Sequence, residues 1–386
     1  MRSFSDLPEE IIVNIVSRLP AKCVGRCRCI SKSWRALLSR PDFIRTHLHV
    51  SRNLQQESLF LISEHTKVWN CISYASLSSA HHLFDEITVS AKKLRFAGVP
   101  RCWSWIYGSC DGLLLVGNWD DDLFVLNPIT REIRKVPDSP FALDPLERFI
   151  TYGFGYDSVS DDYKIVAIYC HCDDYEEEEE KEEEDDCTKM FVDVYSLKTD
   201  SWEKAESSPY DHFSCQFTSG VFVDGCIHWL ASRNTDGRPT IVVFDLAQEK
   251  FREVPPPSSI RGIKCLFDYF LVRGSGCLVV LGSRLCTFYQ RQDGVWVMEE
   301  YGVGDRWTEF TIYDPEADII DEIRPLCMLG QERMVLKDIE KLLVYNLEER
   351  TMEDVDVRGI QLNVLDAASF VETLVSPHGT PERGRD

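Results

Sequence analysis

The densest group of side chains that could do chemistry is Cys170, His171, Cys172 and Asp173. Thiolates, imidazoles and carboxylates are zinc ligands, but a structural zinc site needs separated pairs, such as C-x2-C with a second pair downstream. Here the two cysteines form a C-x-C without a partner pair. We interpret the group as the end of a strand leading into a loop, and we expect no metal ion and no cofactor.

The histidines offer no better catalytic centre. His81 and His82 lie in the polar stretch SSAHHLF, without a neighbouring carboxylate or cysteine that could complete a triad or a metal site. His228 precedes Trp229 in an apolar stretch, which predicts a packed position in a strand rather than a general base.

Two glycine patterns and one acidic cluster are also poor candidates for a site. Gly153–Gly155 and Gly302–Gly304 do not complete the GxGxxG of a phosphate-binding loop, and neither lies between a predicted strand and a helix. Asp120–Asp122 belongs to a predicted hairpin turn, where acidic side chains cap the backbone. The sequence therefore favours a protein that performs no catalysis of its own.

The formal net charge is −22 over 386 residues, and half of it comes from one run. Residues 173–186, DDYEEEEEKEEEDD, hold twelve acidic residues and one Lys. Such a run repels itself and buries nothing, so we expect a solvated loop between two strands, with contact to a basic partner as the alternative. Nucleic-acid binding needs a basic surface that neutralises phosphates, and the sequence shows none, so we expect no nucleic-acid partner.

The cysteines and the apolar runs indicate a compartment. Fifteen cysteines are scattered without regular pairing, which is typical of reduced core thiols in a protein that is not secreted. The first ten residues, MRSFSDLPEE, lack the apolar segment of a signal peptide, and no run of eighteen apolar residues predicts a membrane span. We expect the cytoplasm, the nucleus or both.

The chain is organised around a helical unit at residues 6–43. Apolar residues recur on one face of a first predicted helix and again in a second, and a proline ends each. The two stripes are Ile11, Ile12, Ile15, Val16 and Leu19 before Pro20, then Ile30, Trp34, Leu37 and Leu38 before Pro41. So short a unit cannot build a stable core alone, so part of its apolar face must pack on the rest of the chain or on another protein.

From about residue 58 onward the pattern changes to short strands separated by Gly, Asp, Asn and Pro turns. One hairpin recurs: a strand ending in Leu or an aromatic residue, a polar turn and a second strand. Its anchors, 69, 49, 45 and 56 residues apart, are Leu126, Tyr195, Phe244, Tyr289 and Tyr345. A period of about 45–50 residues is that of a four-stranded propeller blade.

We therefore predict a small all-α unit followed by an all-β, kelch-like β-propeller of about six blades. Ala368–Pro377 predicts one more strand, which pairs with the first blade and closes the ring. The predicted boundaries are 1–48 for the helical unit, 58–377 for the propeller with its acidic loop at 173–186, and 378–386 for a disordered tail.

The helical unit resembles an F-box, the motif through which a substrate receptor binds a Skp-type adaptor and thence a cullin ubiquitin ligase. The order LPEEII…LP…CISKSW carries the resemblance, through Leu7, Pro8, Glu9, Ile11, Ile12, Ile15, Leu19, Pro20 and the run Cys29–Trp34. The chain departs from the motif at Val24, Gly25 and Cys27, where such proteins usually carry Leu-Leu and Phe. Because Gly inside a helix is destabilising by about 1 kcal/mol relative to Ala, we expect weaker adaptor binding than usual.

The repeats resemble the F-box-associated interaction domain of plant F-box proteins. GSCDGLLLV, LFVLNPITRE, YGFGYDSVSDDYKIV and VDVYSLKTDSW carry this resemblance over roughly residues 103–357. The family includes pollen S-locus F-box proteins and receptors that restrain immune signalling. The ETLVSP stretch is somewhat more similar to the immune-regulating branch.

Together these resemblances imply the substrate-recognition subunit of an SCF-type ubiquitin ligase. Its partners would be a Skp-type adaptor, a cullin scaffold and a target protein marked for proteasomal degradation, such as an immune receptor or a pollen–pistil factor. The expected adaptor-binding and core residues are Leu7, Pro8, Ile11, Ile15, Leu19, Pro20, Val24, Ile30 and Trp34. For the target, the candidates are Trp103, Trp105 and Trp119, because Trp often anchors interfaces, although most propeller tryptophans pack between blades.

Three other interpretations stay open at this point. The helical unit could be an amphipathic cap folded onto its own domain. The propeller could be a scaffold that never meets a ligase. It could also be an enzyme or a sugar-binding lectin with a ligand in its central channel.

Overall fold

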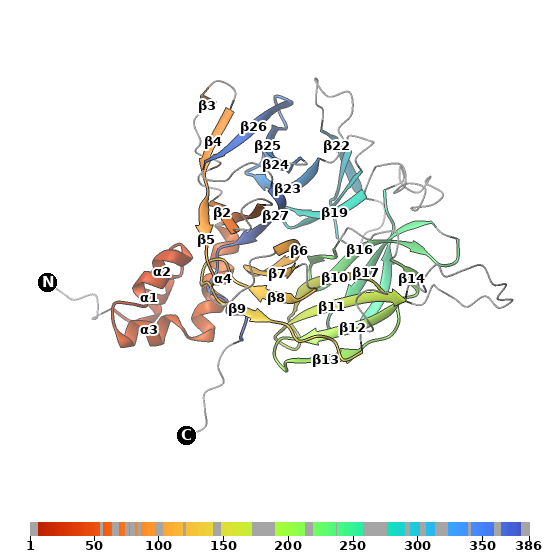
Figure 1. Ribbon diagram of the computed structural model, residues 1–386. Helices are drawn as coiled ribbons and strands as arrows, with labels where there is room; N and C mark the ends of the chain where they lie inside the picture. The colour runs from red at the N-terminus through yellow and green to blue at the C-terminus, as the bar shows by residue number, and fades with distance from the viewer. Residues whose placement is uncertain are drawn as a thin grey trace.

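The structure is a computed structural model of the chain (Figure 1). It describes residues 7–54, 57–63, 69–73, 77, 82–83, 86–96, 103–118, 121–141, 148–171, 190–212, 219–236, 238–257, 276–289, 294–301, 306–312, 323–338, 341–358 and 364–379.

Four helices form the N-terminal unit: α1 (Glu9–Val16), α2 (Ala21–Cys27), α3 (Lys32–Leu38) and α4 (Pro41–Asn53). The sequence predicts two, and the difference arises because each proline that ends a helix also begins the next. Pro20 is the N-cap residue of α2, and Pro41 is the first residue of α4, where its missing N–H has no intrahelical partner to lose. Ser31 caps α3, since its hydroxyl accepts a hydrogen bond from the Trp34 backbone N–H at 3.2 Å.

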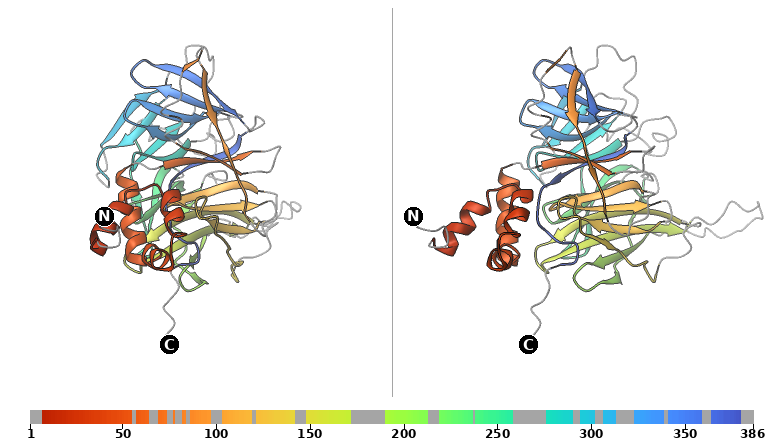
Figure 2. Two further views of the ribbon diagram at one scale, coloured as in Figure 1. Left: turned by 90° about the vertical axis from the view of Figure 1, so that its left-hand side faces the viewer. Right: turned by 60° about the vertical axis from the view of Figure 1, so that its left-hand side comes forward.

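Six sheets follow as blades arranged around a central axis (Figures 1 and 2). Blade one contains β27 (Val364–Val371), β1 (Glu57–Ser63), β2 (Trp69–Ser73) and β5 (Lys92–Leu94); blade two contains β6 (Trp103–Cys110), β7 (Leu113–Asn118), β8 (Leu123–Leu126) and β9 (Ile133–Lys135). Blade three contains β10 (Arg148–Asp157), β11 (Asp162–His171), β12 (Phe191–Ser196) and β13 (Ser201–Lys204); blade four contains β14 (Tyr210–Asp211), β15 (Val221–Val223), β16 (Cys226–Arg233), β17 (Pro239–Asp245) and β18 (Lys250–Val254). Blade five contains β19 (Gly276–Leu281), β20 (Arg284–Tyr289), β21 (Gly294–Met298) and β22 (Trp307–Thr311); blade six contains β23 (Arg324–Leu329), β24 (Arg333–Lys337), β25 (Leu342–Asn346), β26 (Thr351–Arg358), β4 (Glu86–Ser90) and β3 (His82–Leu83).

The inner strands β27, β6, β10, β15, β19 and β23 contact one another in a closed ring. The predicted fold class, an α-helical unit followed by a propeller of about six blades, is therefore confirmed.

Two strand exchanges close the ring. In the first, β27 pairs antiparallel with β1, so that Phe60 lies opposite Ala368. The predicted closing pair is confirmed, but the strand is Val364–Val371, not Ala368–Pro377, because Leu374 and Val375 leave the sheet to pack in two other cores. In the second, which the sequence does not reveal, the segment between β2 and β5 leaves blade one and adds β4 in parallel to β26 of blade six. Blades one and six are thus joined at both their inner and outer edges.

A repeated turn explains the recurring hairpin. In blades two, three, four and six, the residue after the buried anchor has a polar side chain. This side chain accepts hydrogen bonds from backbone N–H groups two or three residues further along the chain. The residue four positions after the polar one has positive φ. The four accepting residues are Asn127, Ser196, Asp245 and Asn346, and those with positive φ are Arg131, Asp200, Glu249 and Arg350. The short Asn, Ser or Asp side chain thus supplies a local turn signal, as the sequence suggests.

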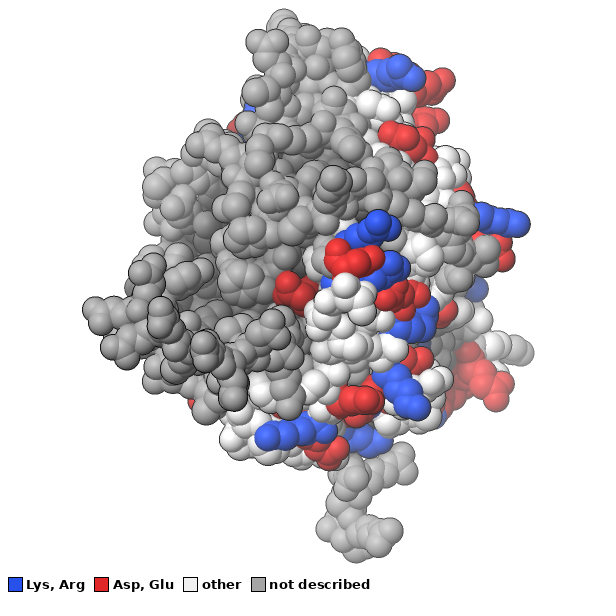
Figure 3. Space-filling model, turned by 90° about the vertical axis from the view of Figure 1, so that its right-hand side faces the viewer, with Lys and Arg blue, Asp and Glu red and all other residues white. Residues whose placement is uncertain are grey.

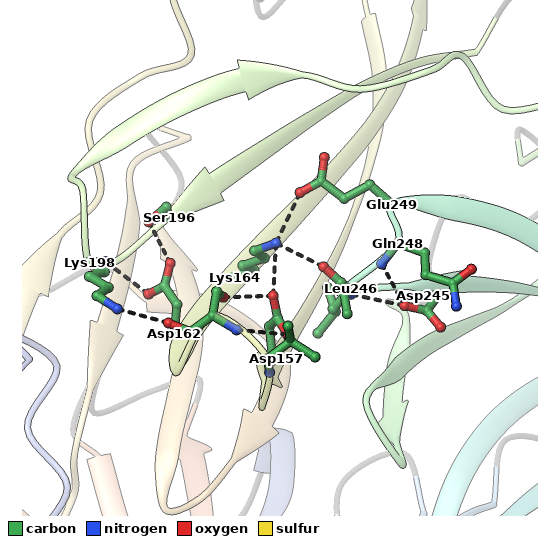
Figure 4. A network of polar contacts seen from close by, with 12 residues as sticks. Asp157, Asp162, Lys164, Ser196, Lys198, Asp245, Leu246, Gln248 and Glu249 are labelled. Atoms are coloured by element: carbon green, nitrogen blue, oxygen red, sulfur yellow. Dashed lines mark hydrogen bonds and ion pairs between the residues drawn. The ribbon is translucent and has the colours of Figure 1, made fainter.

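The propeller core lies between neighbouring blades, and it includes a buried charged group with several partners. The anchors Leu126, Tyr195, Phe244 and Tyr345 are fully buried or nearly so. Between blades three and four, the Lys164 ammonium, with a side chain only 12% exposed, contacts Glu249 Oε1 at 3.0 Å and Asp157 Oδ2 at 3.1 Å, and it donates to the Leu246 carbonyl at 2.8 Å (Figure 4).

Several predicted features fall on residues outside the described ranges. They are the acidic run at 173–186, Trp119, His81, Cys172 and the tail from residue 380 onward. Within the described part of that tail, the Gly379 N–H donates to the Ser376 carbonyl at 3.3 Å in a turn.

Candidate docking surface

The outer face of α1, with the residue two positions before it, carries large apolar side chains that stay exposed in the described part of the chain. Leu7, Ile11 and Ile15 follow one another at four-residue spacing and are 38%, 46% and 45% exposed. Ile30, in the turn after α2, is 66% exposed. Scattered exposed apolar residues are ordinary, but a row of large ones at four-residue spacing on one side marks an interaction surface. We call Leu7, Ile11 and Ile15 the docking surface.

The opposite face of α1 faces the core of the helical unit. Val16 is buried there with Val24, Leu38 and Phe43, and Ile12 packs against them. Helix α1 therefore carries apolar residues on two sides, and only the side with Ile12 and Val16 packs in the core of the helical unit.

The other predicted adaptor-binding residues divide by burial. Pro8 and Pro20 are exposed beside the docking surface, while Leu19 and Trp34 are half-buried and pack partly on the core. Val24 has no exposed surface and lies in the core of the helical unit, so it belongs to the core part of the predicted adaptor-binding and core set.

Backbone carbonyls at the helix ends are satisfied by side chains of this unit. The Arg28 guanidinium donates to the Leu38 carbonyl at 2.7 and 3.2 Å, at the end of α3. The imidazole of the fully buried His47, in α4, lies 3.0 Å from the Leu19 carbonyl that follows α1. These contacts hold α1, α3 and α4 together, and with them the docking surface.

Helix α4 fixes the helical unit to the propeller. Ile44 and Leu48 pack against the core shared by blades two and three. Arg52 pairs with the buried Asp111 after β6, whose other carboxylate oxygen accepts from the Tyr163 hydroxyl at 2.9 Å. Arg45 pairs with Asp161 at 3.2 Å.

The segment after β27 joins the two units a second time. Leu374 is buried in the core of the helical unit, whereas the adjacent Val375 is buried in the propeller core. The Asn127 amide donates to the carbonyls of Thr373 and Val375, at 3.2 and 2.8 Å. This role is not predicted from the sequence. The available signal is that Leu374 and Val375 are adjacent and apolar within the predicted strand Ala368–Pro377, where alternation would place only one of them inside.

The propeller encloses a central cavity of about 1920 Å³ lined mainly by the inner strands. Asp111, which pairs with Arg52, follows the end of β6, so the start of β6 lies at the mouth turned away from the helices. Trp105, near that start, is 41% exposed and lines the cavity. Trp103 begins β6, but its side chain is outside the described atoms. Lys and Arg alternate with Asp and Glu over the coloured part of the face in Figure 3, without a patch of one sign.

The groups considered for chemistry take structural places where they are described. His228 is fully buried, its imidazole nitrogens lie 3.2 Å from the Val221 carbonyl and 2.8 Å from the Tyr301 hydroxyl, and burial lowers its pKa to about 4. The Asn118 amide oxygen accepts from the Asp122 N–H at 2.8 Å, within the predicted acidic turn. Within the described ranges, no group of three or more His, Cys, Asp and Glu is placed to hold a metal ion. Nor does a helix of this described part have the length and hydropathy to cross a membrane.

The chain thus combines a helical unit that has an exposed apolar face with a closed six-bladed propeller. The F-box domain family matches residues 4–46, and the F-box associated beta propeller domain family matches residues 104–375. The chain belongs to this family of F-box proteins with an F-box-associated β-propeller.

Its relatives agree with that assignment. F-box protein CPR1 of Arabidopsis thaliana is 31% identical over 376 residues, covering 91% of this chain and 84% of that protein. The F-box/kelch-repeat protein At3g23880 of the same plant is 26% identical over 380 residues, covering 98% of each. Among solved structures, TolB from Acinetobacter baumannii aligns with a TM-score of 0.42 and 7% identity over 85% of this chain and 72% of that one, which carries no argument about function.

The F-box implies binding to a Skp-type adaptor and the propeller implies binding to a target. This is in general the role of an SCF substrate-recognition subunit, and members of the F-box family are typically non-catalytic.

Proposed function

We propose that this protein recruits a target protein to a cullin-based SCF ligase, so that the target is ubiquitinated and degraded by the proteasome. The adaptor binds the docking surface, and the propeller holds the target without performing chemistry. The protein acts in the cytoplasm, the nucleus or both.

The observation that carries the proposal is the bare outer face of α1. Ile11 and Ile15 lie on a helix whose other face is already packed, so the helix needs neither of them to build its own core. Burying one such side chain contributes about 1.5–3 kcal/mol, which makes these residues suitable anchors for a protein partner.

Holding the target close to the conjugating enzyme raises the effective concentration of its lysines. For the target-binding region we propose the channel mouth at Trp105, because this is an exposed aromatic side chain at the edge of a large cavity. An immune receptor or a pollen–pistil factor would be a target of the kind that the family resemblance suggests.

The test is co-purification of a Skp-type adaptor and cullin with the double variant Ile11→Ala, Ile15→Ala. We expect each truncation to weaken adaptor binding by about 2 kcal/mol, or about thirtyfold. The matched control is Val159→Ala, which shortens an apolar side chain that is 81% exposed on the propeller and should bind as the wild type does. Unchanged adaptor binding by the double variant would overturn the proposal and favour a scaffold outside any ligase.

The same double variant can identify the target. Because it keeps the whole propeller but loses the ligase, it should hold target proteins without destroying them. Proteins captured by the double variant and lost after Trp105→Ala would support the proposed channel mouth; capture unaffected by Trp105→Ala would place the binding region elsewhere.

A further inference from the structure

The net negative charge of the chain belongs to the part that forms the propeller. Residues 1–56 hold ten Lys and Arg against four Asp and Glu, so the helical unit is positive and the residues after it carry the whole negative charge. An uneven charge of this kind affects association with other molecules rather than the fold. The described residues show where part of the excess of carboxylates gathers.

The central cavity holds such an excess. Among the described residues that line it, carboxylates outnumber guanidiniums six to three, and there is neither Lys nor His. The carboxylates belong to Glu57, Asp111, Asp121, Asp224, Glu299 and Asp366. Each guanidinium is paired with one of them: Arg52 with Asp111, Arg284 with Glu299 at 2.9 Å, and Arg324 with Asp366 at 2.8 Å. Asp121 and Asp224 make no ion pair with any residue that the structure describes.

The outside of the propeller differs from the cavity. Over the coloured part of the face in Figure 3, the two signs alternate. Exposed pairs such as Arg306–Glu300 and Lys341–Asp354 join opposite charges at 2.8 Å, where solvent ions also screen them. The cavity walls are formed by strands rich in Val, Leu and Ile. Charges of one sign inside such walls focus the electric field and attract a ligand of the opposite charge.

Trp105 adds an aromatic surface to this negative cavity. Its side chain is 41% exposed and lines the cavity at the mouth turned away from the helices. The next residue, Ile106, donates its N–H to Asp366 Oδ2 at 2.8 Å. Trp105 also lies opposite Gly117, in the hairpin whose turn contains Asp121. The face of an indole attracts the cationic group of Lys or Arg, and the stems of these side chains pack on apolar surface.

We propose that the propeller recognises a basic segment of its target, which enters the central cavity at Trp105. Lys or Arg side chains of this segment lie on the indole and against the carboxylates of the cavity, and its apolar groups contact the walls. The site is the target-binding region already proposed at Trp105, so the choice of a basic segment rests on that proposed function.

The acidic run at 173–186 favours the same kind of partner without belonging to the site. Strand β11 begins beside Asp111, to which the Tyr163 hydroxyl is hydrogen-bonded, and therefore ends on the side of the disc where β6 begins. In the sequence, the run follows this strand almost directly. Its charge increases the rate at which a basic partner meets that side of the disc.

The experiment measures, by fluorescence anisotropy, how a labelled peptide in which Lys alternates with Ser binds to the full chain without adaptor. The wild type should bind it about tenfold more tightly than the same peptide with acetyl-lysine, because acetylation removes the charge. Trp105→Ala should weaken binding of the Lys peptide about thirtyfold. Asp121→Asn should weaken it about threefold, and Asn tolerates the φ of 60° at this position as well as Asp does.

Asp138→Asn is the matched control, since it removes the same charge from an exposed position after β9, outside the described cavity lining. It should bind the Lys peptide as the wild type does. If Trp105→Ala and Asp121→Asn also did so, the peptide would be held by charge elsewhere on the protein and the proposed site would be wrong. Equally tight binding of the acetyl-lysine peptide or of a Glu peptide would overturn the basic segment, as would no binding of the Lys peptide up to about 1 mM.

The peptide assay is independent of the ligase role. The variant Ile11→Ala, Ile15→Ala should bind the Lys peptide as the wild type does, because the docking surface lies on the helical unit. A chain that binds the adaptor through Ile11 and Ile15 but does not bind the Lys peptide would keep the ligase role and lose the basic segment. The opposite pair of results would keep the basic segment and lose the ligase role.

Discussion

Helix α1 and strand β1 are both runs of large apolar residues, but the fold covers them differently. On β1, Leu59, Phe60 and Leu61 have no exposed surface, because the strand is paired on both edges and covered on both faces. On α1, Ile11 and Ile15 stay 46% and 45% exposed. A closed propeller can bury its apolar residues within the chain, whereas a four-helix unit lying on its rim leaves one apolar face for another protein.

The largest test of this contrast compares one truncation in each region. Phe60→Ala should lower the free energy of unfolding by about 3–5 kcal/mol, because it opens a cavity between blades one and two. Ile15→Ala, in contrast, should change it by less than about 0.5 kcal/mol, since the side chain is half exposed. Urea denaturation measures both, and a similar loss in the two variants would contradict the assignment of Ile15 to a docking surface.

A second test separates the two units at their junction. Leu374→Ala should lower the free energy of unfolding of the helical unit by about 2–5 kcal/mol, because it truncates a core side chain that is only 4% exposed. Hydrogen exchange should then show reduced protection of α1–α3 amides, with β10 and β11 unchanged. Val375→Ala is the matched control, because its side chain packs on the propeller core and its loss should reduce protection in blades two and three instead.

A third test uses the pH dependence of stability, which should be affected by two buried histidines of the propeller. Burial lowers the pKa of His212 to about 3 and that of His228 to about 4, against 6.5 when unfolded. Below pH 6.5 the unfolded chain therefore binds more protons, and stability falls as pH falls, by about 2 kcal/mol for each histidine between pH 7 and pH 5.

Urea midpoints at the two pH values measure this effect. The variant His212→Phe, His228→Phe should show a flatter dependence, whatever its stability at pH 7. If the urea midpoint of the variant changed with pH as much as that of the wild type, the two imidazoles would not titrate as their burial requires.

The smallest predicted effect is a gain in the F-box. Gly25 lies inside α2, and an added Cβ would meet no atom within 4 Å, so Gly25→Ala should stabilise the helix by about 1 kcal/mol. Gly112→Ala is the opposite control, since φ is +81° there and the new Cβ would lie 2.3 Å from the Thr373 hydroxyl. Tm should therefore rise for Gly25→Ala and fall for Gly112→Ala. A lower Tm for Gly25→Ala would contradict the open space that the structure shows around Gly25.

The sequence predicts those parts of the structure that depend on neighbouring residues. The blades are predicted because the hairpins carry their own turn signals. Examples are Asn127 and Asp245, whose side chains accept a hydrogen bond from the backbone N–H two residues further on. The α1 stripe is predicted as well, but periodicity alone does not distinguish the inward Ile12 from the outward Ile11.

The parts that escape prediction join distant residues. The parallel pairing of β4 with β26 and the packing of Leu374 in the helical core have no local pattern, since partners so far apart in sequence meet only after folding. Whether Val24 lies in the core or on the surface likewise has no local signal, because its burial depends on how α2 is rotated against α1 and α3.

The segment from β27 to Val375 makes the core of the helical unit depend on the last strand of the propeller. Ser58 and Glu372 are hydrogen-bonded although 314 positions separate them, so the first blade stays open on the ribosome until its last strand emerges. Leu374 follows three residues later than that strand and fills the F-box core. A chain truncated before Leu374 would therefore leave the core of the helical unit incomplete, although α1–α4 are synthesised first.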